Sequence, residues 1–220
     1  MYKNKSVAEQ NSVDLAYDLL MTDSYKNLRA TIWTTKQEEA RFRQLVVNSV
    51  MATDIMDKDL KNLRNARWEK AFSVDEDTGD LPNWVLSNNV NRKATIVIEH
   101  LIQASDVAHT MQHWHIYRKW NERLFEEMSL AYREGRSEND PAVNWYKGEI
   151  GFFDFYIIPL AKKLKDCGVF GVSSHEYLDY AQKNRNEWEE RGQQIVEEMV
   201  EALNRKEDNQ VKRQNVDLFL

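Results

Sequence analysis

Apolar residues recur at intervals of three and four positions along most of the chain, which is the period of an α-helix with one buried face. Alternating apolar and polar runs, which mark strands, are nearly absent, and the chain has only seven Gly and three Pro. The pattern predicts an all-α fold. The expected helices cover residues 7–21, 37–56, 59–72, 91–106, 113–134, 142–167 and 174–204.

Local signals mark the starts of two of these helices. Thr34 or Thr35 before KQEEARF is a candidate N-cap with acidic residues in the first turn that follows. Ser173 or Ser174 before HEYLDYAQ is another.

Three segments are expected to lie outside helices. SVDEDTGDLPNW at 73–84 collects acids, Gly and Pro and is predicted to be the longest loop, and SENDP at 137–141 is a second. Residues 206–220 lose the apolar period, so a flexible tail is expected there, whose terminal LFL could dock on another surface.

Composition narrows the classes of protein. A chain of 220 residues that is 42% hydrophobic can bury one sizeable core, so one domain portion over residues 1–205 is expected. Lys and Arg total 30 against 36 Asp and Glu, mixed along the chain, which argues against nucleic-acid binding. No apolar run approaches the roughly 18 residues of a membrane-spanning helix, and MYKNKSVAEQ has no apolar signal core.

The single Cys167 excludes an internal disulfide framework and fits a reducing compartment. A cytoplasmic chain, or the cytosolic part of a larger membrane-attached protein, is therefore expected.

Residues 100–120, HLIQASDVAHTMQHWHIYRKW, hold four of the five histidines. Asp106, His109 and His113 would share one face of a continuous helix and could clip a metal ion. Against a metal site, tight zinc binding needs three or four convergent ligands, and the remaining His175 is distant in sequence. The alternative is that His113 and His115 are partly exposed residues at a helix start, and His109 a loop residue.

Several stretches, in the same order along the chain, resemble the class I 3′,5′-cyclic nucleotide phosphodiesterases. ASDVAHTMQHWHIYRKWNERLFEEM resembles a family motif of the form A-D-[IL]-S-N-P, spacer, Y-x-x-W, E-E-F. The matching positions are Ala104 (one residue early), Asp106, Tyr117, Trp120, Glu126 and Glu127, with Met128 in place of Phe. Upstream, VVNSVMATDIMDKDL resembles a helix ending in A-T-D-[IM], carried by Ala52, Thr53, Asp54 and Ile55.

Downstream, GEIGFFDFYIIPL resembles the family's S-Q-x-G-F-[IF]-D-x-[IV]-x-x-P signature, with Gly151, Phe152, Asp154 and Pro159 in register. NRNEWEERG resembles its closing helix, and YKNKSVAEQNSVDLAYDLL its Y-x-x-x-S-V-x-E segment, with Glu9 retained. The resemblance runs from about residue 2 to about residue 192.

The resemblance implies an all-helical bundle of the HD-domain/phosphodiesterase type, present here as its C-terminal portion. In that family two divalent ions, zinc with magnesium or manganese, activate a bridging water that hydrolyses cAMP or cGMP to the 5′-monophosphate. A histidine of the family protonates the leaving oxygen.

The chain departs from the family at the metal site. The motifs H-N-x-x-H-A-x-D and H-D-x-x-H, which hold most metal ligands and the proton donor, do not occur in it. Asp106 matches a metal ligand, Glu9 matches a residue behind the metals, and no proton-donating histidine matches. One carboxylate cannot hold a catalytic zinc, so the chain alone is expected to be inactive.

The resemblance also implies a nucleotide pocket. The purine would be clamped by Phe152 and Leu124, with Ile55, Tyr117, Trp120, Asn121 and Phe125 nearby; without the resemblance, such aromatic residues at helical spacing would be assigned to the core. Where the family reads the base with Gln, this chain has Glu149. An ionised carboxylate only accepts hydrogen bonds, so the two adjacent donors of guanine suit it better than adenine does, and a preference for cGMP is expected. The alternative is that Glu149 is a surface acid paired with Lys147 or another base.

Two other functions stay open at this stage. The chain could be a degenerate non-catalytic helical module that binds nucleotide or a protein partner. It could also be a helical interaction domain without a ligand, which burial of Phe152 and Trp120 by neighbouring helices would favour. A missing N-terminal half or regulatory domain is a possible partner of the chain.

Overall fold

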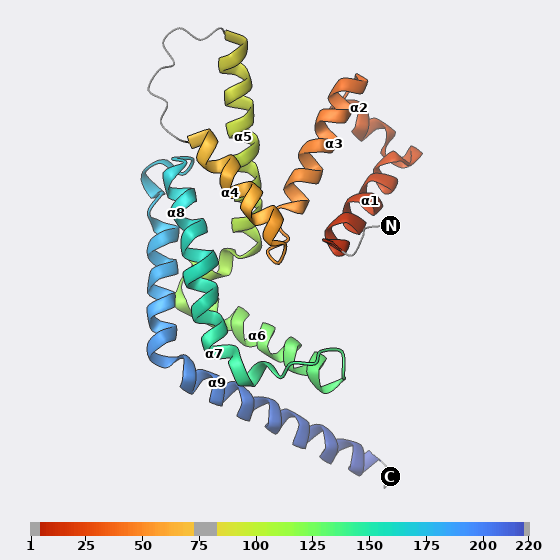
Figure 1. The fold of residues 1–220 in the computed structure, drawn as a ribbon. Coiled ribbons are helices and arrows are strands. Elements are labelled where there is room, and N and C mark those ends of the chain that lie inside the picture. The colour runs from red at the N-terminus through yellow and green to blue at the C-terminus, as the bar shows by residue number, and fades with distance from the viewer. Residues whose placement is uncertain (1–4, 73–82, 218–220) are drawn as a thin grey trace. The chain divides into compact units, whose positions relative to one another are not determined.

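The computed structural model describes the backbone of residues 5–72 and 83–217, and all regular structure in this part of the chain is helical (Figure 1). The all-α prediction is confirmed. The helices are α1 (Val7–Met21), α2 (Lys26–Ile32), α3 (Lys36–Met51), α4 (Lys58–Phe72), α5 (Asn83–Asp106), α6 (Trp114–Arg133), α7 (Pro141–Phe152), α8 (Ile158–Asp166) and α9 (Glu176–Asp217). Four short turns, η1 (Asp23–Tyr25), η2 (Ala108–Met111), η3 (Phe153–Ile157) and η4 (Gly171–Ser173), lie between them. None of the described helices is long and apolar enough to cross a bilayer.

The helices depart from the prediction at several points. The short helix α2 was not predicted, and the helix predicted over 142–167 is interrupted by η3. The helix predicted to end near residue 204 continues to Asp217, so most of the expected tail at 206–220 has a helical backbone. The predicted loop at 73–84 falls almost wholly on residues 73–82, which lie outside the described residues, and α5 begins at Asn83, earlier than expected.

The cap of α3 was predicted correctly at Thr35. Its hydroxyl accepts a hydrogen bond from the backbone N–H of Glu38, while the Glu38 carboxylate accepts from the backbone N–H of Thr35, which forms a capping box. The serine cap of α9 was wrong. Ser174 donates its hydroxyl proton back to the carbonyl of Gly171, and α9 begins two residues later at Glu176.

The chain divides into two compact units, Met1–Asp106 and Val107–Leu220. In the first unit α1 packs on α3, and α5 packs on α3 and α4. Arg64 of α4 donates to the backbone carbonyls of Met51 and Asp54 and so fixes the turn that follows α3. Arg67, one turn further along α4, pairs with the buried Glu99 of α5.

In the second unit, α9 packs along α6, α7 and α8 (Figure 1). Its core is built around Trp188 of α9, Tyr117 of α6 and Phe153 of η3, all of which are fully buried. The ring of Tyr117 meets both others edge-on, at centroid distances of 5.2 Å to Phe153 and 6.0 Å to Trp188. The Trp188 indole N–H donates to the carbonyl of Tyr146 on α7, which satisfies its one polar atom.

The segment η3 is a π-helix between α7 and α8. Pro159 lies two residues into α8, and a proline ring inside a regular helix collides with the carbonyl four residues earlier, here that of Phe155. A π-turn widens the helix at that point and relieves the collision, and such turns frequently mark functional sites. Phe153 and Ile157 at its two ends are fully buried.

Gly192 allows α9 to approach α7 closely. A Cβ at this position would lie 2.8 Å from Cε2 of Trp188 and 2.9 Å from Cδ2 of Tyr146. Trp188 is fully buried and cannot give way cheaply, so we expect Gly192→Ala to lower the free energy of unfolding by about 1–2 kcal/mol, because the cost of overpacking exceeds the gain in helix propensity. Urea denaturation followed by far-UV circular dichroism measures the change.

Gly148 in α7 provides the matched control. No atom lies within 4 Å of a Cβ built there, so Gly148→Ala should raise the free energy of unfolding by up to about 1 kcal/mol through helix propensity alone. A shift of the same sign in both variants would contradict the close packing of α7 on α9.

Candidate functional site

Helix α5 ends at Asp106. This residue is exposed, η2 follows at Ala108–Met111, and α6 starts at Trp114. Asp106, His109 and His113 therefore do not share a face of one helix, and the metal clip considered from their spacing was wrong.

The histidines of this region have contacts of other kinds. His113 is the N-cap residue of α6. Its Nε2 atom is 3.0 Å from the hydroxyl oxygen of Tyr180. The neighbouring His115 is exposed, and the two rings are 5.8 Å apart. The His109 ring faces Trp120 at 6.5 Å. The interpretation of His113 and His115 as exposed residues at a helix start is confirmed.

Among the described residues, no group of three or more His, Cys, Asp and Glu side chains could hold a metal ion. The family is metal-dependent, but the residues of this chain do not fit a two-metal centre, because Asp106 alone matches a ligand position. No catalytic step through metal ions can be derived from these side chains.

Asn184 fixes the connection between η2 and α6, and sequence reasoning missed its role. Its side-chain amide, 1% exposed, donates to the carbonyls of Thr110 at 2.9 Å and Gln112 at 2.7 Å. The available signal was a polar residue on the apolar face of α9, between the buried Ala181 and Trp188.

The clearest polar cluster of the second unit surrounds Glu149. The hydroxyl of Tyr117 donates to Oε2 of Glu149 at 2.7 Å, and the amide of Asn121 lies 3.4 Å from the same hydroxyl. The Trp145 indole N–H donates to Oδ1 of Asn121 at 3.1 Å. Glu149 therefore interacts with the hydroxyl of an aromatic residue, and the alternative that it pairs with Lys147 or another base was wrong.

Burial decides the electrostatics of this cluster. It raises the pKa of Glu149, and the hydrogen bonds from Tyr117 and Asn121 lower that pKa in part. Burial, with the Glu149 carboxylate beside it, raises the pKa of the Tyr117 phenol well above its usual range, so Tyr117 is a permanent donor.

The apolar residues predicted to bind nucleotide lie in different environments. Phe152, at the end of α7, is partly buried and stacks on Tyr156 at 5.4 Å and 15°. Trp120 and Leu124, one turn apart on α6, are 49% and 45% exposed. Phe125 is 1% exposed and meets Trp145 edge-on, so it belongs to the core of the unit.

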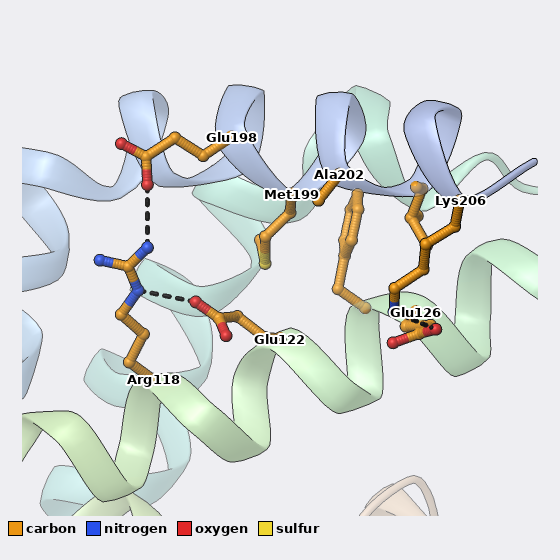
Figure 2. A pocket seen from close by; sticks show the side chains of 9 residues that line it. Arg118, Glu122, Glu126, Glu198, Met199, Ala202 and Lys206 are labelled. Carbon is orange, nitrogen blue, oxygen red and sulfur yellow. Dashed lines mark hydrogen bonds and ion pairs between the residues drawn. The ribbon is translucent and has the colours of Figure 1, made fainter. Parts of the chain in front are cut away.

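A groove of about 220 Å³ lies between α6 and α9 (Figure 2). At one end of the groove Arg118 of α6 binds Glu122 of the same helix and Glu198 of α9 (Figure 2). At the other end Lys206 of α9 pairs with Glu126 of α6 (Figure 2). Phe125, Met199, Ala202 and Leu203 complete its lining. Neither Glu149 nor Phe152 lines it, and Phe125 is the one residue predicted to bind nucleotide that does.

Two predicted site residues belong to the first unit. Ile55 lies in the turn after α3 and is 37% exposed, next to Asp54, which accepts a hydrogen bond from Ser6. Glu9 is partly buried in the first turn of α1. The structure brings Tyr117, Asn121 and Glu149 together, and Ile55 and Glu9 stay predictions.

The fold is all-helical, and its second unit holds the Glu149 carboxylate on the buried Tyr117, which makes this cluster the candidate ligand site of a helical protein. Residues 1–171 match the family model of 3′,5′-cyclic nucleotide phosphodiesterases. The chain therefore belongs to the 3′,5′-cyclic nucleotide phosphodiesterase family.

Curated relatives agree with this family. The chain is 26% identical to the probable 3′,5′-cyclic-AMP phosphodiesterase pde-4 of Caenorhabditis elegans, over 96% of this chain and 31% of the relative. It is 23% identical to the dual specificity calcium/calmodulin-dependent 3′,5′-cyclic nucleotide phosphodiesterase 1B of Mus musculus, over 76% of this chain and 29% of the relative. The chain thus spans about a third of the length of these relatives.

A solved structure shares the fold. The phosphodiesterase domain of the Salpingoeca rosetta rhodopsin phosphodiesterase superposes with a TM-score of 0.60 at 19% identity, over 89% of this chain and 57% of that domain.

Proposed function

We propose that this chain is the C-terminal, nucleotide-binding portion of a catalytic domain that hydrolyses 3′,5′-cyclic nucleotides to 5′-monophosphates in signal transduction. The family match over residues 1–171 supports the reaction class. The observation that carries the assignment of a nucleotide site is the Glu149 cluster: its carboxylate occupies the position that resembles the family's base reader and is held by Tyr117 of α6. The cytoplasmic location expected from the single cysteine is part of the proposal.

The residues present in this chain decide which steps of the reaction it can contribute to. The histidine motifs that would bind zinc and magnesium or manganese and protonate the leaving group do not occur in this chain. Asp106 is proposed as its one metal ligand, with Glu9 behind the metals. The chain alone is expected to bind nucleotide without turning it over.

Base recognition is assigned to the second unit. Phe152 and Leu124 are proposed to clamp the purine, and Glu149 to accept from the N1–H and 2-amino groups of guanine. Trp120, Asn121 and Phe125 lie on the same helix as Tyr117 and Leu124. Ile55, in the first unit, stays a prediction from the family resemblance. In a protein that joins this chain to the two histidine motifs, cGMP should have the higher kcat/KM at neutral pH, and an equal or higher value for cAMP would contradict the assignment of Glu149.

Phe152→Ala is expected to weaken cGMP binding to the 220-residue chain about tenfold or more, because one stacking surface of the purine is lost. Isothermal titration calorimetry at pH 7.5 measures the affinity, and circular dichroism checks the fold. Phe155→Ala is the matched control, since Phe155 lies one turn further along, is 75% exposed and has no place in the proposed site. Equal losses in the two variants would refute the clamp.

A non-catalytic module that binds nucleotide or a protein partner is the second candidate. It is favoured by the finding that no three-ligand cluster exists among the described residues. Hydrolysis of cGMP by the chain alone with added zinc and magnesium would exclude it. A helical domain without a ligand is disfavoured, because Trp120 is half exposed and Phe152 is not fully buried.

A further inference from the structure

The hydrogen-bond partners of Glu149 are neutral. Tyr117 and Asn121, both of α6, bond to its carboxylate. Helix α9 also packs against α7, and its arginines form ion pairs with acids other than Glu149. Arg185 pairs with Asp154 and Glu189. Arg191 pairs with Glu187. On α6, Arg118 is held by Glu122 and Glu198. Among the described residues, no charged group contributes to the ionisation balance of Glu149, which is set by burial and by two neutral donors.

We infer that Glu149 is a proton-controlled purine selector, whose protonated form admits adenine and guanine and whose ionised form admits guanine alone. The inference rests on the proposed nucleotide site and assigns to it a response to pH.

The two forms differ in hydrogen-bonding capacity. An ionised carboxylate offers acceptors only. Oε2 already accepts a hydrogen bond from the Tyr117 hydroxyl, and the lone pairs of the two oxygens that Tyr117 and Asn121 leave unused can accept hydrogen bonds from the N1–H and 2-amino groups of guanine. Adenine would place a ring nitrogen, an acceptor, against one of these oxygens. A protonated carboxyl group offers one donor and one acceptor, as a Gln amide does, and so can pair with either base.

The direction of the pH effect follows from the environment. Burial raises the pKa of Glu149 above its usual value. As pH rises through this raised value, the proton is lost and adenine binding weakens, while guanine binding persists. The ratio of cGMP to cAMP affinity should therefore increase with pH.

Tyr117 is the positioning residue of this selector. Its hydroxyl fixes Oε2 and stabilises the ionised form, so removing it should raise the pKa of Glu149 further. In Tyr117→Phe, which keeps the buried ring, the loss of cAMP affinity should shift to higher pH.

The test is calorimetric titration of the full chain with cGMP and with cAMP at a series of pH values from about 5 to about 8.5. Both bases stay neutral in this range. The affinity ratio is expected to rise by about tenfold to a hundredfold across the range in the natural chain. It should stay flat in Glu149→Gln, which cannot titrate, and rise at higher pH in Tyr117→Phe. A ¹³C-NMR titration of the Glu149 carboxyl reports its protonation without any ligand, and its midpoint should coincide with that of the affinity ratio.

The outcomes separate the two proposals. If both nucleotides bind and the ratio does not change with pH, or changes equally in Glu149→Gln, the selector is refuted and the nucleotide site stands. If neither nucleotide binds the natural chain at any pH, the proposed function of the site fails, and the selector with it.

Discussion

Replacing Trp188 with alanine is expected to lower the free energy of unfolding by about 3–5 kcal/mol. The side chain is fully buried, meets Tyr117 edge-on at 6.0 Å and donates its indole proton to the carbonyl of Tyr146. The substitution opens a cavity between α6, α7 and α9 and removes the hydrogen bond from the indole to the Tyr146 carbonyl. Urea denaturation followed by far-UV circular dichroism gives the change and does not depend on tryptophan fluorescence.

Trp120→Ala is the matched control for this prediction. Trp120 is 49% exposed, and Arg123 of the same helix lies over its ring at 5.0 Å. Its removal should cost less than about 1 kcal/mol in stability, since most surface changes do. A loss in Trp120→Ala comparable to that in Trp188→Ala would show that the core of the second unit is not centred on Trp188.

Arg67→Met is expected to lower the stability of the first unit by about 2–3 kcal/mol at neutral pH. Arg67 donates to Oε2 of Glu99 at 3.1 Å, and its NH2 lies 3.0 Å from Oε1 without forming an aligned hydrogen bond. Glu99 is 2% exposed, and removing Arg67 leaves this buried carboxylate with the charge of Arg64 alone to offset its burial. The figure is below the usual cost of breaking a buried pair because the Arg67 side chain is 34% exposed and its charge is partly screened.

The cost of Arg67→Met should depend on pH. Burial raises the pKa of Glu99 in the folded chain, and Arg67 opposes that rise. A raised pKa contributes stability that is present below the unfolded value of about 4.3 and is lost as pH rises through the folded value. Without Arg67 the folded pKa rises further, so the variant should lose little at pH 4 and most at pH 7.5. In a Glu99→Gln background the same substitution should cost less than about 1 kcal/mol at both pH values, and an unchanged cost would contradict the role of the pair.

The sequence predicted the helices better than their interruptions. Apolar period and the Thr35 cap located α1, α3, α4 and α6 within two residues or, at the end of α3, five. Periodicity cannot detect η3, because apolar residues continue through it and one additional residue alters the pattern only slightly. It also missed α2, whose seven residues are too few for a periodic signal.

The site was less predictable from sequence than the fold. The family resemblance selected Glu149, Tyr117 and Asn121, but the bond from Tyr117 to Glu149 joins residues 32 positions apart, and only tertiary packing brings them together. Local reasoning instead gave Lys147 or another base as the alternative partner, because it considers near neighbours. Trp145 and Asn184 escaped notice for the same reason, since their hydrogen bonds connect different elements.

The π-helical segment has a consequence for the angular phase of the helices that it joins. In an uninterrupted α-helix each residue turns by roughly 100°, so the face of α8 would be dictated by that of α7. The surplus residue in Phe153–Ile157 resets this phase. The chain can then direct Glu149 towards Tyr117 of α6 and, a few residues later, bury Leu160 and Leu164 where α8 packs on α9. The continuous helical segment formed by α7, η3 and α8 thus has two faces whose orientations are independent. The packing of α8 therefore does not fix the orientation of Glu149.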